Sequence, residues 1–148
     1  MASNNRLRMF LVGSLLLVSL SILAQSDEQE IALYSSAGKP IAYIAVEDDF
    51  TIYLWDGKPV AYLQGENIYG FNGKHLGWYK SGAAYDHEGT VAGATKGKLR
   101  GIPQISPIKS IKQIKPIKAI RQIAPIRPIF QLTWSKDSFK NFLLQGID

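Results

Sequence analysis

The chain has 148 residues, no cysteine, only two histidines and no apolar run long enough to cross a bilayer. The absence of cysteine excludes disulfide bonds, thiolate metal sites, a cysteine nucleophile and an N-terminal lipidated cysteine. The sequence also lacks a phosphate-binding loop, a dinucleotide fingerprint and a Gly-x-Ser-x-Gly nucleophile elbow. A chain of this length suffices for one modest core with appended segments.

The first segment has the order of a secretory signal peptide. Arg6 and Arg8 precede an uncharged, largely apolar stretch from Met9 to Ala24, and polar residues follow directly. These 16 residues fall short of the roughly 20 that a spanning helix needs. We therefore expect cleavage after Ala24 and export to the periplasm or the medium, with an uncleaved membrane anchor as the alternative. Because cysteine is absent, a lipoprotein is not expected.

The rest of the chain consists of two segments of opposite charge. Residues 25–95 carry 10 acidic and 4 basic side chains, whereas residues 96–148 carry 11 basic and 2 acidic ones. The formal net charge of +5 therefore hides an acidic segment and a basic one. We divide the chain into a signal peptide (1–24), a domain of four repeats (25–95), a basic tail (96–131) and a C-terminal helical segment (132–148).

The acidic segment contains four internal repeats. They align on glycines that lie 19, 16 and 16 residues apart: Gly38, Gly57, Gly73 and Gly89. Four positions before each glycine stands a tyrosine: Tyr34, Tyr53, Tyr69 and Tyr85. The dipeptides Asp56-Gly57 and Asn72-Gly73 are typical of two-residue type I′ turns, so each repeat is predicted to be a β-hairpin. Ala37-Gly38 and Glu88-Gly89 fit that turn less well, and other loops are expected there.

Alternation along the second and third hairpins gives one bulky and one small apolar face. The bulky face is expected to carry Tyr53, Trp55, Val60, Tyr62, Tyr69, Phe71, Leu76 and Trp78. The small face is expected to carry Ile52, Leu54, Ala61, Ile68, Gly70 and Gly77. Because both faces are apolar, we predict an all-β fold in which about eight strands close into a shallow barrel, with either face at the centre.

The repeat has the form Tyr-x-x-[Asp/Asn]-Gly-Lys-x-[Val/Leu]-[Ala/Gly]-[Tyr/Trp] at residues 53–62 and 69–78. A basic tail with Ile-Lys-Pro-Ile-Lys and then Leu132-Thr133-Trp134-Ser135 follows. In these features the chain resembles the bacterial four-fold β-flower proteins over residues 33–135. The resemblance implies four pseudo-symmetric hairpin petals and brings no catalytic residue with it. The fourth repeat departs from the pattern at Thr90, Ala92 and Ala94, so a shortened or irregular petal is expected there.

The basic tail has an isoleucine at every third position from Ile102 to Ile129. A period of three matches neither an α-helix nor a strand, but it matches the polyproline II helix. The residue after each isoleucine is mostly basic: Lys109, Lys112, Lys115, Lys118, Arg121 and Arg127. At about 3.1 Å per residue the stretch is roughly 80 Å long, so it either wraps around the domain or reaches away from it.

Several roles are open for this tail. Four interpretations stay open: a disordered linker, an arm that brings its cations to an anionic envelope surface, a ligand for a groove on a protein partner, and a nucleic-acid binder. Export argues against the last, so no nucleic-acid partner is expected. The opposite charges also allow the tail to bind its own barrel, in which case salt would loosen it.

A short helix is predicted after the tail. Ser135 is the expected N-cap, with Trp134 and Phe139 as a hydrophobic staple. Phe139, Phe142 and Leu143 share one face of this helix. We expect that face to dock on the barrel, and the alternative is that it plugs the open end.

Catalysis has little support in the sequence. In a strand, His87 would point away from its neighbours Asp86 and Glu88, so this triplet cannot by itself converge on a metal or a substrate. A ring arrangement would allow His87 to lie near His75, but polar residues beside turns are ordinary surface residues. His75 and His87 are therefore expected at the surface, and we expect no metal and no cofactor.

These features favour an exported, non-enzymatic binding or structural module of the bacterial cell envelope. Candidate contacts are the tail cations named above and the aromatic residues Tyr34, Tyr53, Tyr62, Tyr69 and Trp78. Core packing is the competing interpretation of the tyrosines. Two other functions stay open: a carrier of an apolar or lipid ligand in the barrel centre, and a hydrolase that uses His75 and His87. A cavity at the axis would favour the carrier, and a filled centre would favour the module.

Overall fold

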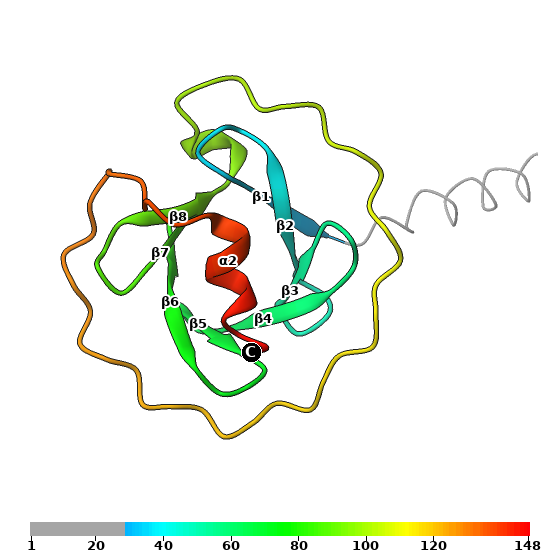
Figure 1. Ribbon diagram of the computed structural model, residues 1–148, viewed down its shortest axis with the longest axis vertical. Coiled ribbons are helices and arrows are strands. Elements are labelled where there is room, and N and C mark those ends of the chain that lie inside the picture. Colours follow the sequence, from blue (N-terminus) through cyan, green and yellow to red (C-terminus); the bar gives the residue numbers. More distant parts are fainter. Residues whose placement is uncertain (1–28) are drawn as a thin grey trace, which may run out of the picture.

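The computed structural model describes residues 29–148, and the predicted signal peptide lies outside the described residues. Eight antiparallel strands form a closed barrel in chain order, followed by a 3-10 turn and a short helix (Figure 1). The elements are β1 (Glu30–Tyr34), β2 (Pro40–Ala45), β3 (Thr51–Leu54), β4 (Pro59–Gln64), β5 (Asn67–Gly70), β6 (His75–Lys80), β7 (Ala83–Tyr85), β8 (Val91–Ala94), η1 (Lys96–Lys98) and α2 (Phe139–Leu144).

The strands pair as four hairpins, and the barrel closes where Tyr34 of β1 pairs with Ala94 of β8. This arrangement confirms the predicted all-β ring of four hairpins. The fourth hairpin is the shortest, with three residues in β7 and four in β8. The departures of the fourth repeat from the sequence pattern therefore mark a real shortening of the petal.

The hairpin turns differ from the predicted type I′ turns. In the second hairpin the Gly57 N–H donates to the Leu54 carbonyl at 2.9 Å, and the Leu54 N–H donates to the Lys58 carbonyl at 2.8 Å. Gly57 has a φ of 90°, whereas Asp56 is not among the residues with positive φ. The Asp56 carboxylate instead accepts the Lys58 N–H at 3.0 Å. A type I turn that ends in a glycine bulge replaces the type I′ turn.

All four hairpins share this turn. The first and last hairpins therefore use a loop other than type I′, as expected, and the type I′ prediction is wrong for the second and third. The corresponding glycines Gly38, Gly73 and Gly89 have φ values of 75°, 86° and 84°, and each donates to the residue three positions before it. Glycine alone is required at the bulge, because the other turn positions keep ordinary backbone angles.

The bulge corrects part of the predicted face assignment. The register of β3 and β4 shifts beside the turn, so Tyr53 lies opposite Pro59 rather than Val60. Val60 and Leu76, which strict alternation places on the bulky face, pack in the interior with the small and aliphatic side chains. The residues predicted for the small face line the barrel centre together with them. The sequence left open which face lies at the centre, and the structure shows that it is the small one.

The helix α2 fills that centre (Figure 1). Phe139, Phe142 and Leu143 are buried in the same cluster as the inward side chains of the strands. A Cβ atom on Gly93 would lie 2.5 Å from the Phe139 ring, and one on Gly77 would lie 3.2 Å from Phe142. The small inner face therefore makes room for the helix, which plugs the barrel in addition to docking on it.

The predicted N-cap of this helix is wrong. Ser138 caps α2, and its hydroxyl accepts the Asn141 N–H at 3.1 Å. Ser135 lies three residues earlier, where its hydroxyl accepts the Asp137 N–H and its own N–H pairs with Val91 of β8. The chain crosses the rim at this point before the helix begins, so Trp134 does not act as a helix staple.

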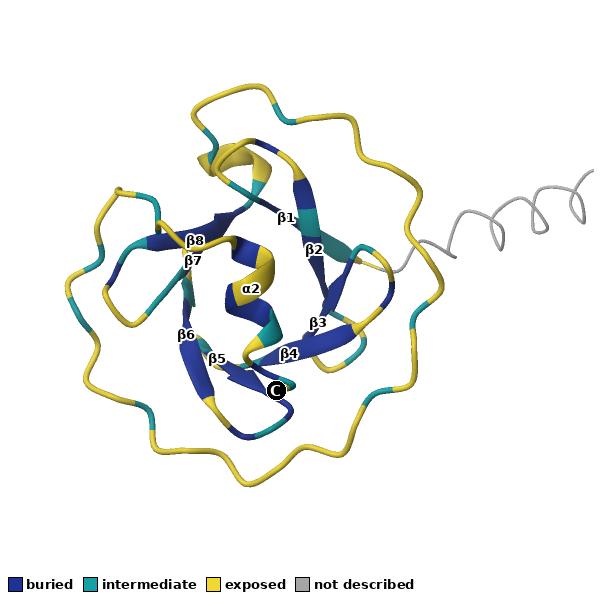
Figure 2. Ribbon diagram, viewed as in Figure 1, coloured by how far each residue is buried: buried dark blue, intermediate teal, exposed yellow. Residues whose placement is uncertain are grey.

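The basic tail wraps around the barrel (Figures 1 and 2). Residues 99–131 contain no helix or strand and run as an open ring outside the petals. The ring returns to β8, where Trp134 forms a parallel bridge with Val91. Of the two courses that its length allowed, the tail takes the one around the domain.

Candidate functional site

The tail follows the barrel with a period of nine residues, three times the isoleucine period. A glutamine recurs at every ninth position: Gln104, Gln113, Gln122 and Gln131. The backbone N–H of each donates to the carbonyl of one turn glycine at 2.8–2.9 Å. Each nine-residue unit of the tail therefore serves one petal, and this period was the signal in the sequence that predicts the ring.

The turn glycines let the tail backbone approach closely. A Cβ atom on Gly57 or Gly73 would lie 2.1 Å from the carbonyl oxygen of Ile111 or Ile120, closer than any real contact allows. Residues Ile102 and Ile129 bring their carbonyls near the other two turns in the same way. Glycine is thus required twice over at these positions, for its positive φ and for the space that the tail occupies.

The cations of the tail point inward onto the barrel. Lys109 and Lys112 bind Glu30, and Arg127 binds Glu66 with 2.6 Å between nitrogen and oxygen. Lys118 and Arg121 lie over tyrosine rings: the Lys118 Nζ is 4.2 Å from the centre of the Tyr62 ring, and the Arg121 Cζ is 5.8 Å from that of Tyr69. Each of the six predicted contact cations touches an acidic or aromatic residue of the domain.

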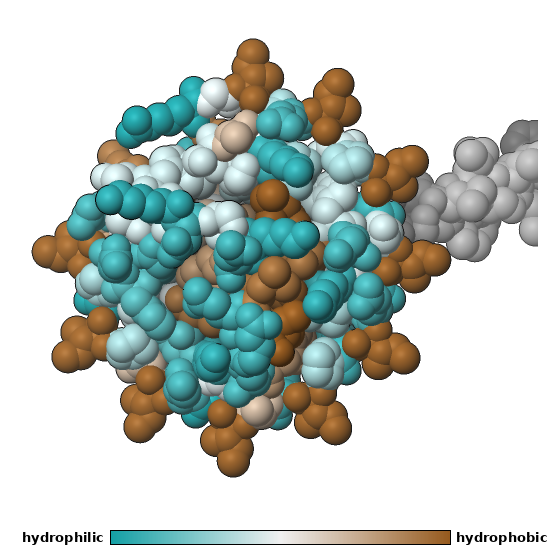
Figure 3. Space-filling view, in the orientation of Figure 1, coloured by the Kyte–Doolittle hydropathy of each residue, from teal (hydrophilic) through white to brown (hydrophobic). Residues whose placement is uncertain are grey.

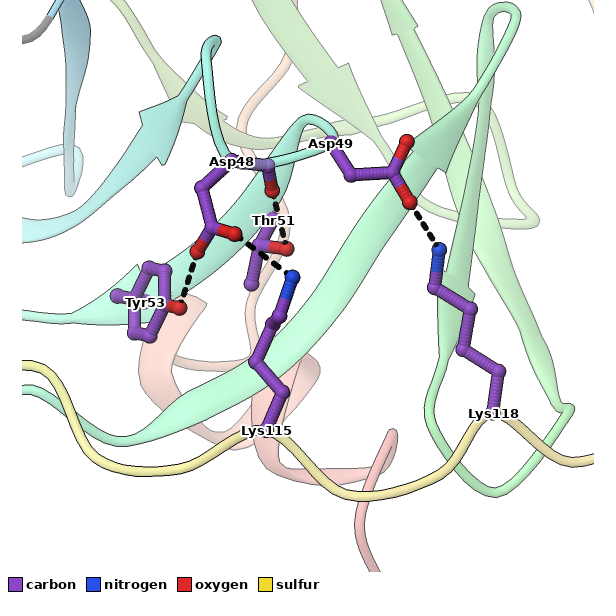
Figure 4. A network of polar contacts seen from close by, with 6 residues as sticks. All are labelled: Asp48, Asp49, Thr51, Tyr53, Lys115 and Lys118. Atoms are coloured by element: carbon purple, nitrogen blue, oxygen red, sulfur yellow. Dashed lines mark hydrogen bonds and ion pairs between the residues drawn. The ribbon is translucent and has the colours of Figure 1, made fainter.

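The loop between β2 and β3 supplies two further acids (Figure 4). Lys115 and Lys118 each bind one aspartate, Asp48 and Asp49, at 2.7 Å. The Asp48 carboxylate also accepts the Tyr53 hydroxyl, which fixes it against the wall. This loop accounts for the wider spacing of 19 residues between the first two turn glycines, so the extra residues carry the acids that meet the tail.

The ion pairs lower the pKa of the domain carboxylates. Burial alone would raise the pKa of Glu30 and Asp48, but hydrogen bonds and positive charges from the tail lysines outweigh it, and both pKa values fall below the ordinary range. For Asp49 the hydrogen bond from Lys118 is the main cause of a lowered pKa. The tail therefore favours the charged form of the acids that hold it.

Four of the five predicted aromatic contacts, Tyr53, Tyr62, Tyr69 and Trp78, lie against side chains of the tail. Tyr34, Tyr53, Tyr62, Tyr69 and Trp78 are all buried, with at most 8% of each residue exposed. Their rings form pairs along the outer wall, such as Tyr62 and Tyr69, whose ring centres are 6.2 Å apart. In the fourth petal Phe130 of the tail stacks on Tyr85 at 4.0 Å, where the second and third petals receive the cations of Lys112 and Arg121. A ligand would reach these aromatics only if it displaced the tail.

Ring closure brings the two histidines together. The Nδ1 atom of His75 lies 2.9 Å from Nε2 of His87, and its Nε2 lies 3.0 Å from the side-chain oxygen of Asn67. His75 is 4% exposed and contacts the edges of Tyr69 and Trp78. The expectation of a surface position is thus wrong for His75, because β5, β6 and the fourth turn enclose it.

This environment makes His75 a poor proton acceptor. Burial, reinforced by the neighbouring His87, lowers the pKa of His75 from 6.5 to about 4. Both of its ring nitrogens have hydrogen-bond partners, so neither is open to a substrate. Within residues 29–148 no group of three or more histidine, aspartate or glutamate side chains has the geometry to hold a metal ion.

The isoleucines of the tail point outward. All ten of them, from Ile102 to Ile129, are 88–98% exposed. They project around the rim of the molecule as a single row, which we call the isoleucine belt (Figure 3). They stand apart from one another in Figure 3, yet ten large aliphatic side chains exposed at a regular spacing differ from the singly scattered apolar residues of an ordinary surface.

Open clefts lie at the side of the molecule where the chain crosses to α2. One of about 510 Å³ is lined by His87, Glu88 and Phe142, among others, and one of about 340 Å³ lies beside Ser138 and Lys140. Both are open to solvent and reach the edge of the core beside α2, at Phe142 and Phe139. Neither η1 nor α2, the helices of the described part, has the length and apolar character needed to cross a membrane.

Comparison with known proteins gives one match. A family model described as 4-fold beta flower protein matches residues 31–143, from the first strand to the helix that plugs the barrel. No curated protein and no solved structure matches the chain.

Proposed function

The chain belongs to the 4-fold beta flower protein family, and from that premise we propose that it is a non-enzymatic interaction module that acts through its isoleucine belt. The observation that carries the proposal is the outward exposure of all ten isoleucines. Burying one such side chain stabilises a complex by about 1.5–3 kcal/mol. An isoleucine belt that stays in water has none of this stabilisation at any of its ten positions.

The same architecture argues for the belt over the other candidate contacts. The aromatic residues Tyr53, Tyr62, Tyr69 and Trp78 are buried against the tail. The tail cations have acidic or aromatic partners within the molecule. The tail holds its polar side inward and its apolar side outward, the opposite of what solvent exposure alone would favour. Contact through the cations of the tail with an anionic envelope surface would require these ion pairs to open.

The filled centre supports a module rather than a carrier. Phe139, Phe142 and Leu143 occupy the space that an apolar or lipid ligand would need. We further propose that the module works in the bacterial cell envelope, after removal of residues 1–24. That part of the proposal depends on the charged, apolar and polar order of residues 6–28 in the sequence.

A binding assay with a belt variant tests the proposal. Purified envelope is mixed with the chain from residue 25 onward, or with a variant in which Ile108, Ile114, Ile117 and Ile123 are changed to threonine. A control variant carries glutamine at the exposed lysines Lys58, Lys74, Lys136 and Lys140, which lie off the belt. We expect the belt variant to lose most of its binding and the control to keep it. Equal binding of all three proteins would refute a role for the belt.

A further inference from the structure

We propose that the partner of the isoleucine belt is a second copy of this protein, which meets the first edge to edge. This inference rests on the proposed function and names the partner of the same surface. Two belts would interlock, with isoleucines of one copy filling the spaces between isoleucines of the other.

The spacing of the belt supports this choice. Every third side chain faces outward, so consecutive isoleucines lie about 9 Å apart if the tail rises by the polyproline II value. Between them the residue that follows each isoleucine can turn toward the barrel, as the inward contacts of Lys115 and Lys118 show. Each space along the rim is therefore bounded by two isoleucines. A second copy has the same spacing between its isoleucines because it has the same sequence. Any other partner would need apolar side chains at that same spacing.

Charge also permits two belts to meet. The tail is strongly basic, and two such tails in contact would repel each other if their cations pointed outward. In the described part of the chain Lys109, Lys115 and Arg127 are instead paired with Glu30, Asp48 and Glu66 of their own domain. Approach of two rims therefore brings together apolar side chains, while most of the neighbouring cations are paired with acids of their own domain.

The direction of the ring is compatible with a symmetric contact. When two rings lie in one plane and face the same way, their edges run in opposite directions at the point of contact. A two-fold axis parallel to the barrel axes relates such copies, and each then presents the same residues to the other. The contact is a closed, isologous one at every point of the belt.

Curvature limits the strength of each contact. A convex rim allows only a few isoleucines from each copy to meet, so one contact buries less than the roughly 1,000 Å² expected of a stable interface. The belt is exposed to a similar degree all the way around, however, with no arc that stands out. Each copy can therefore take several neighbours, and many weak contacts together would form a planar array.

A lipid bilayer fits the belt less well. The hydrocarbon core of a bilayer is about 30 Å thick, while the belt is a single row of side chains. Lipid around the rim would also cover the ion pairs that flank the row, such as those of Lys109 and Lys115. Burying charges at that depth is costly.

Sedimentation velocity across a range of concentrations tests the inference. Three proteins are compared from residue 25 onward: the unchanged chain, a belt-free variant with threonine at all ten isoleucines, and a one-arc variant that keeps only Ile114, Ile117 and Ile120. We expect large assemblies for the first, monomers for the second and dimers as the largest species for the third. A second one-arc variant that keeps Ile123, Ile126 and Ile129 serves as the matched control and should also stop at dimers.

Cross-linking provides a measurement that does not depend on heavily substituted variants. Because the chain has no cysteine, a single cysteine introduced as Ile117→Cys is a unique site for a short bis-maleimide. We expect cross-linked dimers from this variant and none from Lys140→Cys, whose exposed site lies on α2. Equal yields from both sites, or a monomeric unchanged chain at every concentration, would overturn self-association. If envelope binding still depended on the belt in that case, the proposed function would survive with a different partner.

Discussion

Replacing Gly57 by alanine tests the two reasons for a glycine at this turn, the space that the tail occupies and the positive φ. The new Cβ atom would lie 2.1 Å from the Ile111 carbonyl oxygen, so the tail must move away from the second petal. Two hydrogen bonds are lost with it, from Ser110 N–H to the Trp55 carbonyl and from Gln113 N–H to the Gly57 carbonyl. At about 0.5–1.5 kcal/mol each, they contribute roughly 1–3 kcal/mol.

The positive φ adds a cost that has nothing to do with the tail. An L-residue held in this region loses about 1–2 kcal/mol, so we expect Gly57→Ala to lower the free energy of unfolding by roughly 2–5 kcal/mol in total. Gly65→Ala is the matched control. Gly65 also has a positive φ, of 60°, but a Cβ atom there would have no neighbour within 4 Å. This variant should therefore lose only the backbone part.

Limited trypsin digestion measures the position of the tail directly. Lys112 and Lys118 lie in the ring and are followed by residues other than proline, so trypsin can cleave after them once the tail leaves the barrel. We expect cleavage at Lys112 to become markedly faster in Gly57→Ala than in Gly65→Ala, with urea titrations giving the two stabilities. If the two variants showed the same stability loss and the same digestion rate, close packing of the tail on the turn would contribute nothing, and the reasoning would be refuted.

Three further results are expected. Phe139→Ala empties the barrel centre and should lower the free energy of unfolding by about 3–5 kcal/mol in urea titrations, whereas exposed Lys140→Ala should change it little. Because the pKa of His75 is lowered to about 4, the unfolded chain takes up its proton first, so stability should fall as the pH drops from about 6.5 to 4, and less so in His75→Gln. The lowered pKa of Glu30 acts from about pH 4.5 downward: its contribution is fully present above pH 4.5, disappears as the pH falls through the folded pKa, and should be absent in Glu30→Gln.

The repeat pattern of the sequence was sufficient to predict the barrel but not the details of its turns. Asn-Gly and Asp-Gly indicate a type I′ turn when only the local preference for positive φ is considered. In the structure the aspartate side chain of Asp56 binds the backbone two residues ahead, and the glycine alone takes the unusual angle. The resulting bulge also explains why Val60 faces the interior, since strict alternation breaks at that point.

The tail shows a different limit of prediction from sequence. Its period of three indicates which side chains share a face, but does not tell which face meets the barrel. An exposed isoleucine and an inward lysine reverse the usual expectation, and only the acidic partners on the domain make the reversal favourable. The contact between His75 and His87 follows from ring closure, but the burial of His75 depends on how Tyr69 and Trp78 pack around it, which the repeat pattern does not tell.

The order of the elements along the chain has a consequence for how the protein folds. The strands are synthesised first, yet Phe139, Phe142 and Leu143, which complete the core, follow all eight of them. Contacts such as that between Lys109 and Glu30 join residues separated by 79 positions. Since closing long loops precedes any gain from such contacts, we expect a slow, cooperative final step in which the ring of the tail and the plug settle together. Until that step, the nascent barrel is hollow, and its apolar interior is open to chaperones and to aggregation.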